Sequence, residues 1–180
     1  MTLKELLDYM KYLQKENIYV LSLNDIHIRF AEEDRNSIIS EMSRFVNSGV
    51  VKKLTYNFYI NPFLDESKER ILIEFVKKVR QLEFFYLSLD YRAFELGLIS
   101  QTPNVMTFVT TNGLSKFYVT TLGMNVSFVK QKKSMKGIHF DKERGIYVAD
   151  KERVLYDAKI HKLEYLLDLI EEKEGLYEKR

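Results

Sequence analysis

The stretch EDRNSIISEMSRFVNSGVVKKLTYNFYINP, residues 33–62, decides the fold of the first third of the chain. Apolar side chains recur in its first half at the spacing that places them on one face of a helix. The pattern stops at Gly49, a residue type that commonly follows a helix end because it accepts a left-handed backbone. We therefore predict a helix over residues 33–48, and its core-facing side chains are Ile38, Ile39, Met42, Phe45 and Val46.

Two further amphipathic helices are predicted before this stretch. Thr2 and Glu5 form a capping-box pattern at the start of the chain, and apolar residues then recur at helical spacing. Ser22 can cap a second, shorter helix. The apolar positions are Leu3, Leu6, Leu7, Met10 and Leu13 in the first helix and Leu23, Ile26 and Phe30 in the second.

A small β-hairpin is predicted directly after the third helix. Residues 50–54 and 58–60 are β-prone runs, and the residues between them fit a short connection. Pro62 closes the unit. Three short helices followed by a two-stranded hairpin is the order of a winged helix-turn-helix, in which the third helix is the recognition helix. We expect this DNA-binding domain to span residues 1–63.

Composition favours a globular protein and excludes several classes of site. Hydrophobic residues make up 46% of the 180-residue chain and charged residues 30%, a balance that buries a core and solvates a surface. The absence of cysteine excludes disulfides, thiolate metal sites and catalytic cysteines, and suits a reducing cytosol. Charged residues between Lys4 and Lys11 interrupt the apolar stretch that a signal peptide needs, and no apolar run approaches transmembrane length. We expect a cytoplasmic protein without a cofactor.

Charge is unevenly distributed along the chain, although the formal net charge is only +2. Lysine and arginine number 8 against 9 acidic residues in residues 1–65, 13 against 8 in residues 66–149, and 7 against 9 in residues 150–180. The middle of the chain is therefore basic and the two ends are slightly acidic. An N-terminal domain that binds DNA must rely on where its cations lie rather than on their number.

A second domain is predicted over residues 66–180. Ser67 opens an amphipathic helix. Ser88 caps a shorter helix, which ends at Gly97 in a left-handed cap position. The longer helix is expected to bury Ile71, Leu72, Phe75, Val76, Val79 and Leu82 and to leave Lys77, Lys78 and Arg80 facing outward.

Beyond Pro103 the periodicity changes from helical to strand-like. Asp150 then caps a further helix, and Leu163, Leu166, Leu167 and Ile170 mark a last one. The β-branched and aromatic runs are residues 105–110, 116–120, 126–130 and 146–149. The predicted fold class is α+β: an N-terminal winged helix-turn-helix, followed by a small α+β domain with a mostly antiparallel sheet and C-terminal helices.

Three segments carry a family resemblance. The first is Gly49 with VVKKLTYNFYINP, residues 50–62, whose ending is a Tyr-x-Asn-Pro motif. The second, YLSLDYRAFELGLI, contains Ser88, Ala93, Gly97 and Leu98. The third, VADKERVLYDA, contains Ala149, Asp150, Glu152, Arg153, Leu155 and Asp157 in an Ala-Asp-x-Glu-Arg-x-Leu-x-Asp pattern. In order and spacing, these segments resemble the AbiEi family of type IV toxin–antitoxin (abortive infection) systems.

This resemblance spans nearly the whole chain and implies a function. It implies a winged helix that binds an inverted repeat in operator DNA, as a homodimer on the DNA, and represses its own operon. It also implies a C-terminal antitoxin domain that counteracts a nucleotidyltransferase-like toxin, for which a stable complex is not required in this class. Two features depart from the family: the third helix starts with acidic residues, and Lys52 and Lys53 stand where many relatives carry arginines.

The candidate DNA contacts lie on the third helix and the hairpin. The helix face opposite the core presents polar side chains that can donate hydrogen bonds to base edges or phosphates. The two lysines of the hairpin can bind a phosphate or the adjacent minor groove. The alternative for both groups is an ordinary solvated surface. The candidate residues are Arg35, Asn36, Ser40, Arg44, Lys52 and Lys53.

The densest basic patch of the chain is predicted to contact DNA or a partner protein, or else only to keep a loop soluble. It consists of Lys130, Lys132, Lys133 and Lys136. The acidic and basic residues at the start of the following helix are assigned a structural role. In particular, Glu152 stabilises the helix because it lies near the positive end of the helix dipole.

The sequence motifs give little support for an enzymatic function. Four carboxylates surround one predicted strand and, with Lys136 or Lys142, superficially resemble a metal-dependent nuclease site, but their spacing fits no motif. They are Asp141, Glu143, Asp150 and Glu152. The three histidines, His27, His139 and His161, show no metal-binding pair spacing. We expect neither catalysis nor a metal site. The alternative to an antitoxin is a stand-alone winged-helix transcriptional regulator whose C-terminal domain serves dimerisation or ligand sensing.

Overall fold

The computed structural model describes residues 1–131 and 135–178. Helices account for 43% and strands for 21% of the residues, so the mixed α and β content predicted from the sequence is confirmed. The chain forms two compact units: Met1–Phe75 with Thr120–Leu122, and Val76–Val119 with Gly123–Arg180. This division falls inside a helix, later than the boundary expected between residues 63 and 66, which stays a prediction.

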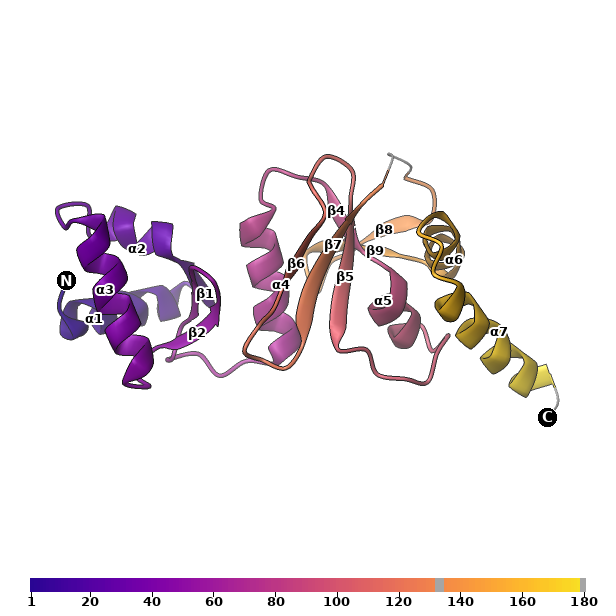
Figure 1. The fold of residues 1–180 in the computed structure, drawn as a ribbon, viewed down its shortest axis with the longest axis horizontal. Coiled ribbons are helices and arrows are strands. Elements are labelled where there is room, and N and C mark those ends of the chain that lie inside the picture. Colours follow the sequence, from indigo (N-terminus) through magenta and orange to yellow (C-terminus); the bar gives the residue numbers. More distant parts are fainter. Residues whose placement is uncertain (132–134, 179–180) are drawn as a thin grey trace. The chain divides into compact units, whose positions relative to one another are not determined.

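Residues 1–62, all of which are described, form three helices and a three-stranded antiparallel sheet in the order β1-β3-β2 (Figure 1). Ile60 of the central strand faces Val20 on one side and Lys52 on the other. Strand β1 was not predicted: it lies directly before α2 and forms by pairing with β3, about 40 residues away in the sequence. The elements are α1 (Leu3–Lys15), β1 (Val20–Ser22), α2 (Leu23–Arg29), α3 (Arg35–Asn47), β2 (Lys52–Thr55) and β3 (Phe58–Ile60).

Each of these helices begins at a side chain that accepts hydrogen bonds from the first free backbone N–H groups. Two capping boxes form, Thr2 with Glu5 and Ser22 with Asp25. Helix α3 starts at Arg35, two residues later than predicted. The reason is that Asp34 occupies the cap position, where its carboxylate accepts from the N–H groups of Asn36 at 2.9 Å and Ser37 at 3.1 Å.

The core of the first unit joins all three helices to the sheet. Asn61, the asparagine of the Tyr-x-Asn-Pro motif, is fully buried, and its Nδ2 donates to the carbonyls of Met10 at 2.9 Å and Ile18 at 3.2 Å. This side chain therefore ties the end of the hairpin to α1. The buried cluster comprises Leu6, Met10, Leu13, Leu21, Leu23, Ile26, Ile38, Met42, Phe45, Val51 and Tyr59.

The described residues of the second unit form a six-stranded sheet in the order β6-β7-β5-β4-β9-β8 (Figure 1). Three of the five strand pairings in this sheet are antiparallel and two are parallel: β4 pairs parallel with β9, and β5 pairs parallel with β7. Strands β5 and β7 can pair in parallel because β6, which lies between them in the sequence, pairs with the other edge of β7. The strands are β4 (Phe85–Leu87), β5 (Val105–Thr110), β6 (Lys116–Tyr118), β7 (Asn125–Lys130), β8 (Ile138–Asp141) and β9 (Ile146–Ala149).

Helices pack against one face of this sheet. The face that carries Tyr86 packs against α5 (Leu89–Glu95) and α6 (Lys151–Ile160), and α7 (Glu164–Glu178) completes the cluster. On the opposite face, Arg80 follows α4 (Lys68–Val79), and its guanidinium carbon lies 4.4 Å from the centroid of the Phe128 ring. The buried cluster comprises Tyr86, Leu89, Ala93, Leu98, Ile99, Val109, Ala149, Val154, Ala158, Leu166 and Ile170.

Two predictions for the end of α4 were wrong. Arg80, expected to face outward, is buried, forms an ion pair with Glu83 at 2.7 Å and donates to the Leu114 carbonyl at 2.7 Å. Leu82, expected in the buried stripe, is 92% exposed, because the helix ends at Val79 and the helical spacing no longer applies. No described helix is long and apolar enough to cross a membrane.

Candidate nucleic-acid interface

The outer face of α3 carries four of the six predicted DNA contacts. Arg35, Asn36, Ser40 and Arg44 are all exposed, whereas Ile38, Met42 and Phe45 on the other side of the helix are buried. The burial pattern agrees with the predicted helical spacing except at Ile39. This residue was expected in the core but is 40% exposed, because it lies at the border of the buried stripe. The pattern leaves one continuous polar face between the Asp34 cap and Gly49, whose positive φ of 74° ends the helix.

Contacts within α3 hold part of this face in place. The Ser40 hydroxyl donates a hydrogen bond to the Asn36 carbonyl, one turn earlier in the helix, at 2.9 Å. Its proton is therefore already engaged within the helix. The Arg44 guanidinium forms an ion pair with the Glu41 carboxylate, but the arginine side chain stays 72% exposed. An exposed pair of this kind contributes little stability, so Arg44 can exchange its partner at small cost.

The hairpin presents the other two predicted contacts. Lys52 and Lys53 are exposed on β2, and the Lys53 ammonium lies 5.9 Å from the ring centroid of Tyr56, which is 77% exposed at the tip. Asn57 turns the chain with a φ of 60°. Nothing in the sequence indicated that Thr121 contacts this strand within the first unit. The Thr121 hydroxyl donates a hydrogen bond to the Lys53 carbonyl at 2.5 Å.

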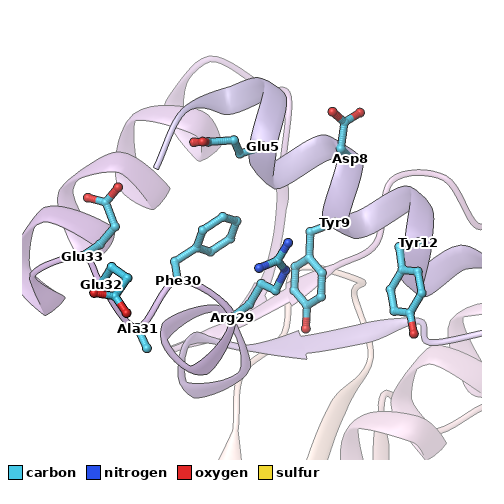
Figure 2. A pocket seen from close by; sticks show the side chains of 9 residues that line it. All are labelled: Glu5, Asp8, Tyr9, Tyr12, Arg29, Phe30, Ala31, Glu32 and Glu33. Carbon is cyan, nitrogen blue, oxygen red and sulfur yellow. The ribbon is translucent and has the colours of Figure 1, made fainter.

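An acidic hollow of about 770 Å³ lies away from this polar face, beside the start of α3. Figure 2 shows Glu5, Asp8, Tyr9 and Tyr12 along α1 and, across from them, the segment from Arg29 to Glu33. Four carboxylates and one guanidinium line it, and one of these carboxylates, Glu33, pairs with the N-terminal ammonium of Met1. The hollow is lined by Glu5, Asp8, Tyr9, Tyr12, Arg29, Phe30, Ala31, Glu32 and Glu33.

The predicted basic patch is only partly described. Lys130 and Lys136 are exposed, and the Lys130 N–H donates to the Ser115 hydroxyl at 3.0 Å. Lys132 and Lys133 lie outside the described residues. Lys136 also borders a hollow of about 280 Å³ at the start of α6.

Two residues of α6, Arg153 and Asp157, belong to a largely buried polar cluster that the sequence did not reveal. We call it the Asp157 cluster: Tyr86, Ser88, Gln131, Arg153, Asp157 and His161. The fully buried Asp157 carboxylate accepts from Ser88 Oγ at 2.8 Å and Gln131 Nε2 at 2.9 Å. It also accepts from the Tyr86 hydroxyl at 3.0 Å and pairs with Arg153 Nε at 2.9 Å.

Ser88 illustrates how this cluster changes a local prediction. The residue stands at the cap position of α5, as predicted, but its side chain makes no capping hydrogen bond because it is directed to Asp157. Burial raises the pKa of Tyr86, and the nearby Asp157 carboxylate raises it further. Burial lowers the pKa of His161, whose Nε2 lies 2.9 Å from Gln131 Oε1.

The carboxylates of the nuclease alternative make local backbone contacts. Asp141 Oδ1 accepts from the N–H groups of Glu143 and Arg144, and Asp150 Oδ1 accepts from the Arg153 N–H at 2.8 Å as the cap of α6. Among the described residues, no group of three or more histidine, aspartate and glutamate side chains is arranged to hold a metal ion. His27, His139 and His161 lie on α2, on β8 and at the end of α6.

No protein-family model matches the chain, and no curated protein gives a match to it. The functional assignment therefore depends on the geometry described above and on the resemblance of its three sequence segments.

Proposed function

We propose that the chain is a DNA-binding antitoxin and autoregulator. Its first unit is a winged helix-turn-helix, in which α2 and α3 form the helix-turn-helix and the β2–β3 hairpin is the wing. The observation that carries this proposal is the outer face of α3, where Arg35, Asn36, Ser40 and Arg44 are exposed together. Lys52 and Lys53 on β2 extend this surface.

The proposed mode of binding follows from the shape and chemistry of this surface. Helix α3 enters the major groove of duplex DNA, where an arginine can donate two hydrogen bonds to a guanine and Asn36 can pair with an adenine. The lysines of β2 contact the phosphates beside that groove. Few cations are available, so a dimer on an inverted repeat supplies the affinity that one copy lacks.

The proposed role of the second unit depends on the sequence resemblance. Ser88 belongs to one resembling segment, and Arg153 and Asp157 belong to another, and these three residues meet in the Asp157 cluster. Two segments that lie far apart in the sequence thus contribute side chains to the same hydrogen-bonded cluster. We propose that this unit counteracts a nucleotidyltransferase-like toxin and that the chain itself catalyses no reaction.

DNA binding is tested with duplex DNA taken from upstream of the chain's own gene. Arg35→Ala and Arg44→Ala should each weaken binding by about 1–3 kcal/mol if the arginine contacts a base. Arg70→Ala is the matched control, because this arginine is 61% exposed in the same unit but lies on α4. Equal affinities of the parent and the Arg35→Ala/Arg44→Ala double variant across a salt titration would refute the role of α3.

The antitoxin role is tested by growth rescue. The chain is co-expressed with a nucleotidyltransferase encoded beside its gene, once that enzyme alone is shown to arrest growth. Rescue by both the parent and the Arg35→Ala/Arg44→Ala double variant is the expected result, because the two functions reside in different units. A chain that binds its operator but rescues no such arrest is a stand-alone regulator instead.

A further inference from the structure

Part of the connection between β6 and β7 belongs to the first unit. The connection spans residues 119–124, and Thr120–Leu122 within it cluster with Met1–Phe75. The residues on either side of these three belong to the second unit. We call Thr120–Leu122 the strap. The first unit is therefore built from two separate segments of the chain, and the second of these is held at both ends by β6 and β7.

The strap is hydrogen-bonded to β2 at an irregular point of the first unit's sheet. Lys53 pairs with Tyr59 and Thr55 pairs with Phe58, so the register passes over Leu54, as it does at a β-bulge. Leu54 is fully buried, and its carbonyl accepts from the Thr121 N–H at 3.0 Å. A buried backbone carbonyl needs such a donor, and the strap supplies it.

The same irregularity lies beside a candidate DNA contact. The Thr121 hydroxyl donates to the Lys53 carbonyl at 2.5 Å, next to the bond that Leu54 accepts. A bulge bends its strand and changes the direction of neighbouring side chains. The strap thus bonds to the two residues of β2 whose backbone sets how the Lys53 side chain is presented.

The strap has an ordered conformation, and the second unit fixes both of its ends. Thr120 is buried, and its hydroxyl accepts from the Leu122 N–H at 3.2 Å. Before and after the connection, Tyr118 of β6 pairs with Val126 of β7, which is fully buried. Because this pairing closes the connection into a short loop, the strap loses little conformational entropy when it bonds to β2.

We propose that the strap makes the wing depend on the folding of the second unit, so that the second unit regulates the affinity for operator DNA; the regulatory part rests on the DNA-binding function proposed above. When the pairing of β6 with β7 is lost, the strap becomes a flexible segment and the Leu54 carbonyl loses its donor. The wing then loosens while the helices of the first unit stay folded. By linkage, DNA that binds the ordered wing favours the bonded strap in return.

The first test follows backbone amide exchange in the full chain by nuclear magnetic resonance. Thr121→Val removes the hydroxyl bond and should speed exchange of the β2 amides about twofold to twelvefold. Thr121→Pro also removes the N–H donor and should speed it further, and the α1 amides should be unchanged in both variants. Thr111→Val is the matched control, because the Thr111 hydroxyl bonds only to the adjacent Asn112 side chain among the described contacts. Unchanged β2 exchange in both Thr121 variants would overturn the proposal.

The second test perturbs the second unit alone. Asp157→Asn breaks its buried ion pair and should speed exchange of the β2 amides about tenfold or more, since exchange reports even rare openings. Asp168→Asn, on the exposed side of α7, should leave them unchanged. In the Thr121→Pro background, Asp157→Asn should have no further effect on β2. An equal effect in both backgrounds would show that the strap does not connect the two, and the proposal would fail.

Operator binding, measured by fluorescence anisotropy on labelled duplex from upstream of the gene, tests the regulatory part. Thr121→Val should weaken binding up to about twelvefold, Thr121→Pro should weaken it more, and Thr111→Val should bind as the parent does. Parent-like affinity of both Thr121 variants would refute the regulation and leave the DNA-binding function standing. A parent that binds no duplex would instead refute the DNA-binding function, and the exchange measurements would still decide whether the second unit controls the wing.

Discussion

Replacing Asp157 by asparagine is expected to destabilise the second unit by about 3–5 kcal/mol, the usual cost of breaking a buried ion pair on one side. The carboxylate is fully buried, accepts hydrogen bonds from Tyr86, Ser88 and Gln131, and lies 2.9 Å from Arg153 Nε. Asparagine keeps the shape but leaves the buried guanidinium without a counter-ion. Because a domain is stable by only about 5–15 kcal/mol, the substitution should remove a large share of that stability.

Equilibrium urea unfolding followed by circular dichroism measures this loss on the full chain. The two compact units require a fit that allows two transitions, of which only one should move. Asp168→Asn on the exposed side of α7 is the control and should change stability by less than about 0.5 kcal/mol.

A double variant tests whether the loss of stability in Asp157→Asn is electrostatic in origin. Arg153→Met/Asp157→Leu should be closer to the parent than Asp157→Asn is, because it leaves no unpaired charge in the interior. A loss below about 1 kcal/mol in Asp157→Asn would refute the view that this carboxylate balances a buried cation.

Three further outcomes follow from local geometry. Burial lowers the pKa of His161, so the unfolded chain binds more protons below about pH 6.5, and stability should fall there as pH falls; urea midpoints of His161→Gln should depend less on pH. Asp34→Ala removes the cap of α3 and should cost about 0.5–2 kcal/mol in thermal unfolding. Gly49→Ala should cost about 1–2 kcal/mol for its left-handed backbone alone. Gly137→Ala should cost more in the same assay, because its Cβ would lie 2.8 Å from a neighbouring side chain; equal losses would contradict this.

Local signals carried the sequence-based prediction of the fold. The caps at Thr2, Ser22 and Asp150 and the breaks at Gly49 and Gly97 depend on residues within one turn of each other, and all five lie where the sequence indicated. Most of the interior face of α3 was predictable for the same reason, and Ile39 at its border was the exception. The spacing of its apolar residues is fixed by the helix itself.

The features that the sequence missed depend on distant partners. Strands β1 and β4 are short, each lies just before a helix, and each forms by pairing with strands that are distant in the sequence. Arg80 looked like an outward residue because its position on a helix gives no sign of the Leu114 carbonyl 34 positions away.

The residues of the candidate site likewise fall into those that local sequence signals predict and those that depend on distant partners. The exposure of Arg35 and Arg44 followed from the helix period, so their place on the surface could be predicted. The Asp157 cluster could not, although Arg153 and Asp157 stand one helical turn apart. Its other members come from β4, from the residue before α5 and from the end of β7, and only the sheet brings them together.

The parallel pairing of β4 with β9 sets the order in which a newly made chain can fold. About 60 residues separate the paired Tyr86 and Tyr147. At a synthesis rate of about 5–20 residues per second, β4 therefore waits roughly 3–12 s for its partner. In residues 1–62 the β2–β3 hairpin needs no such delay, and β1 waits for β3 across about 40 residues only. On the ribosome, β5 can pair with one edge of β4 early, whereas the edge that pairs with β9 is open to chaperones for longer than the edges of the first sheet.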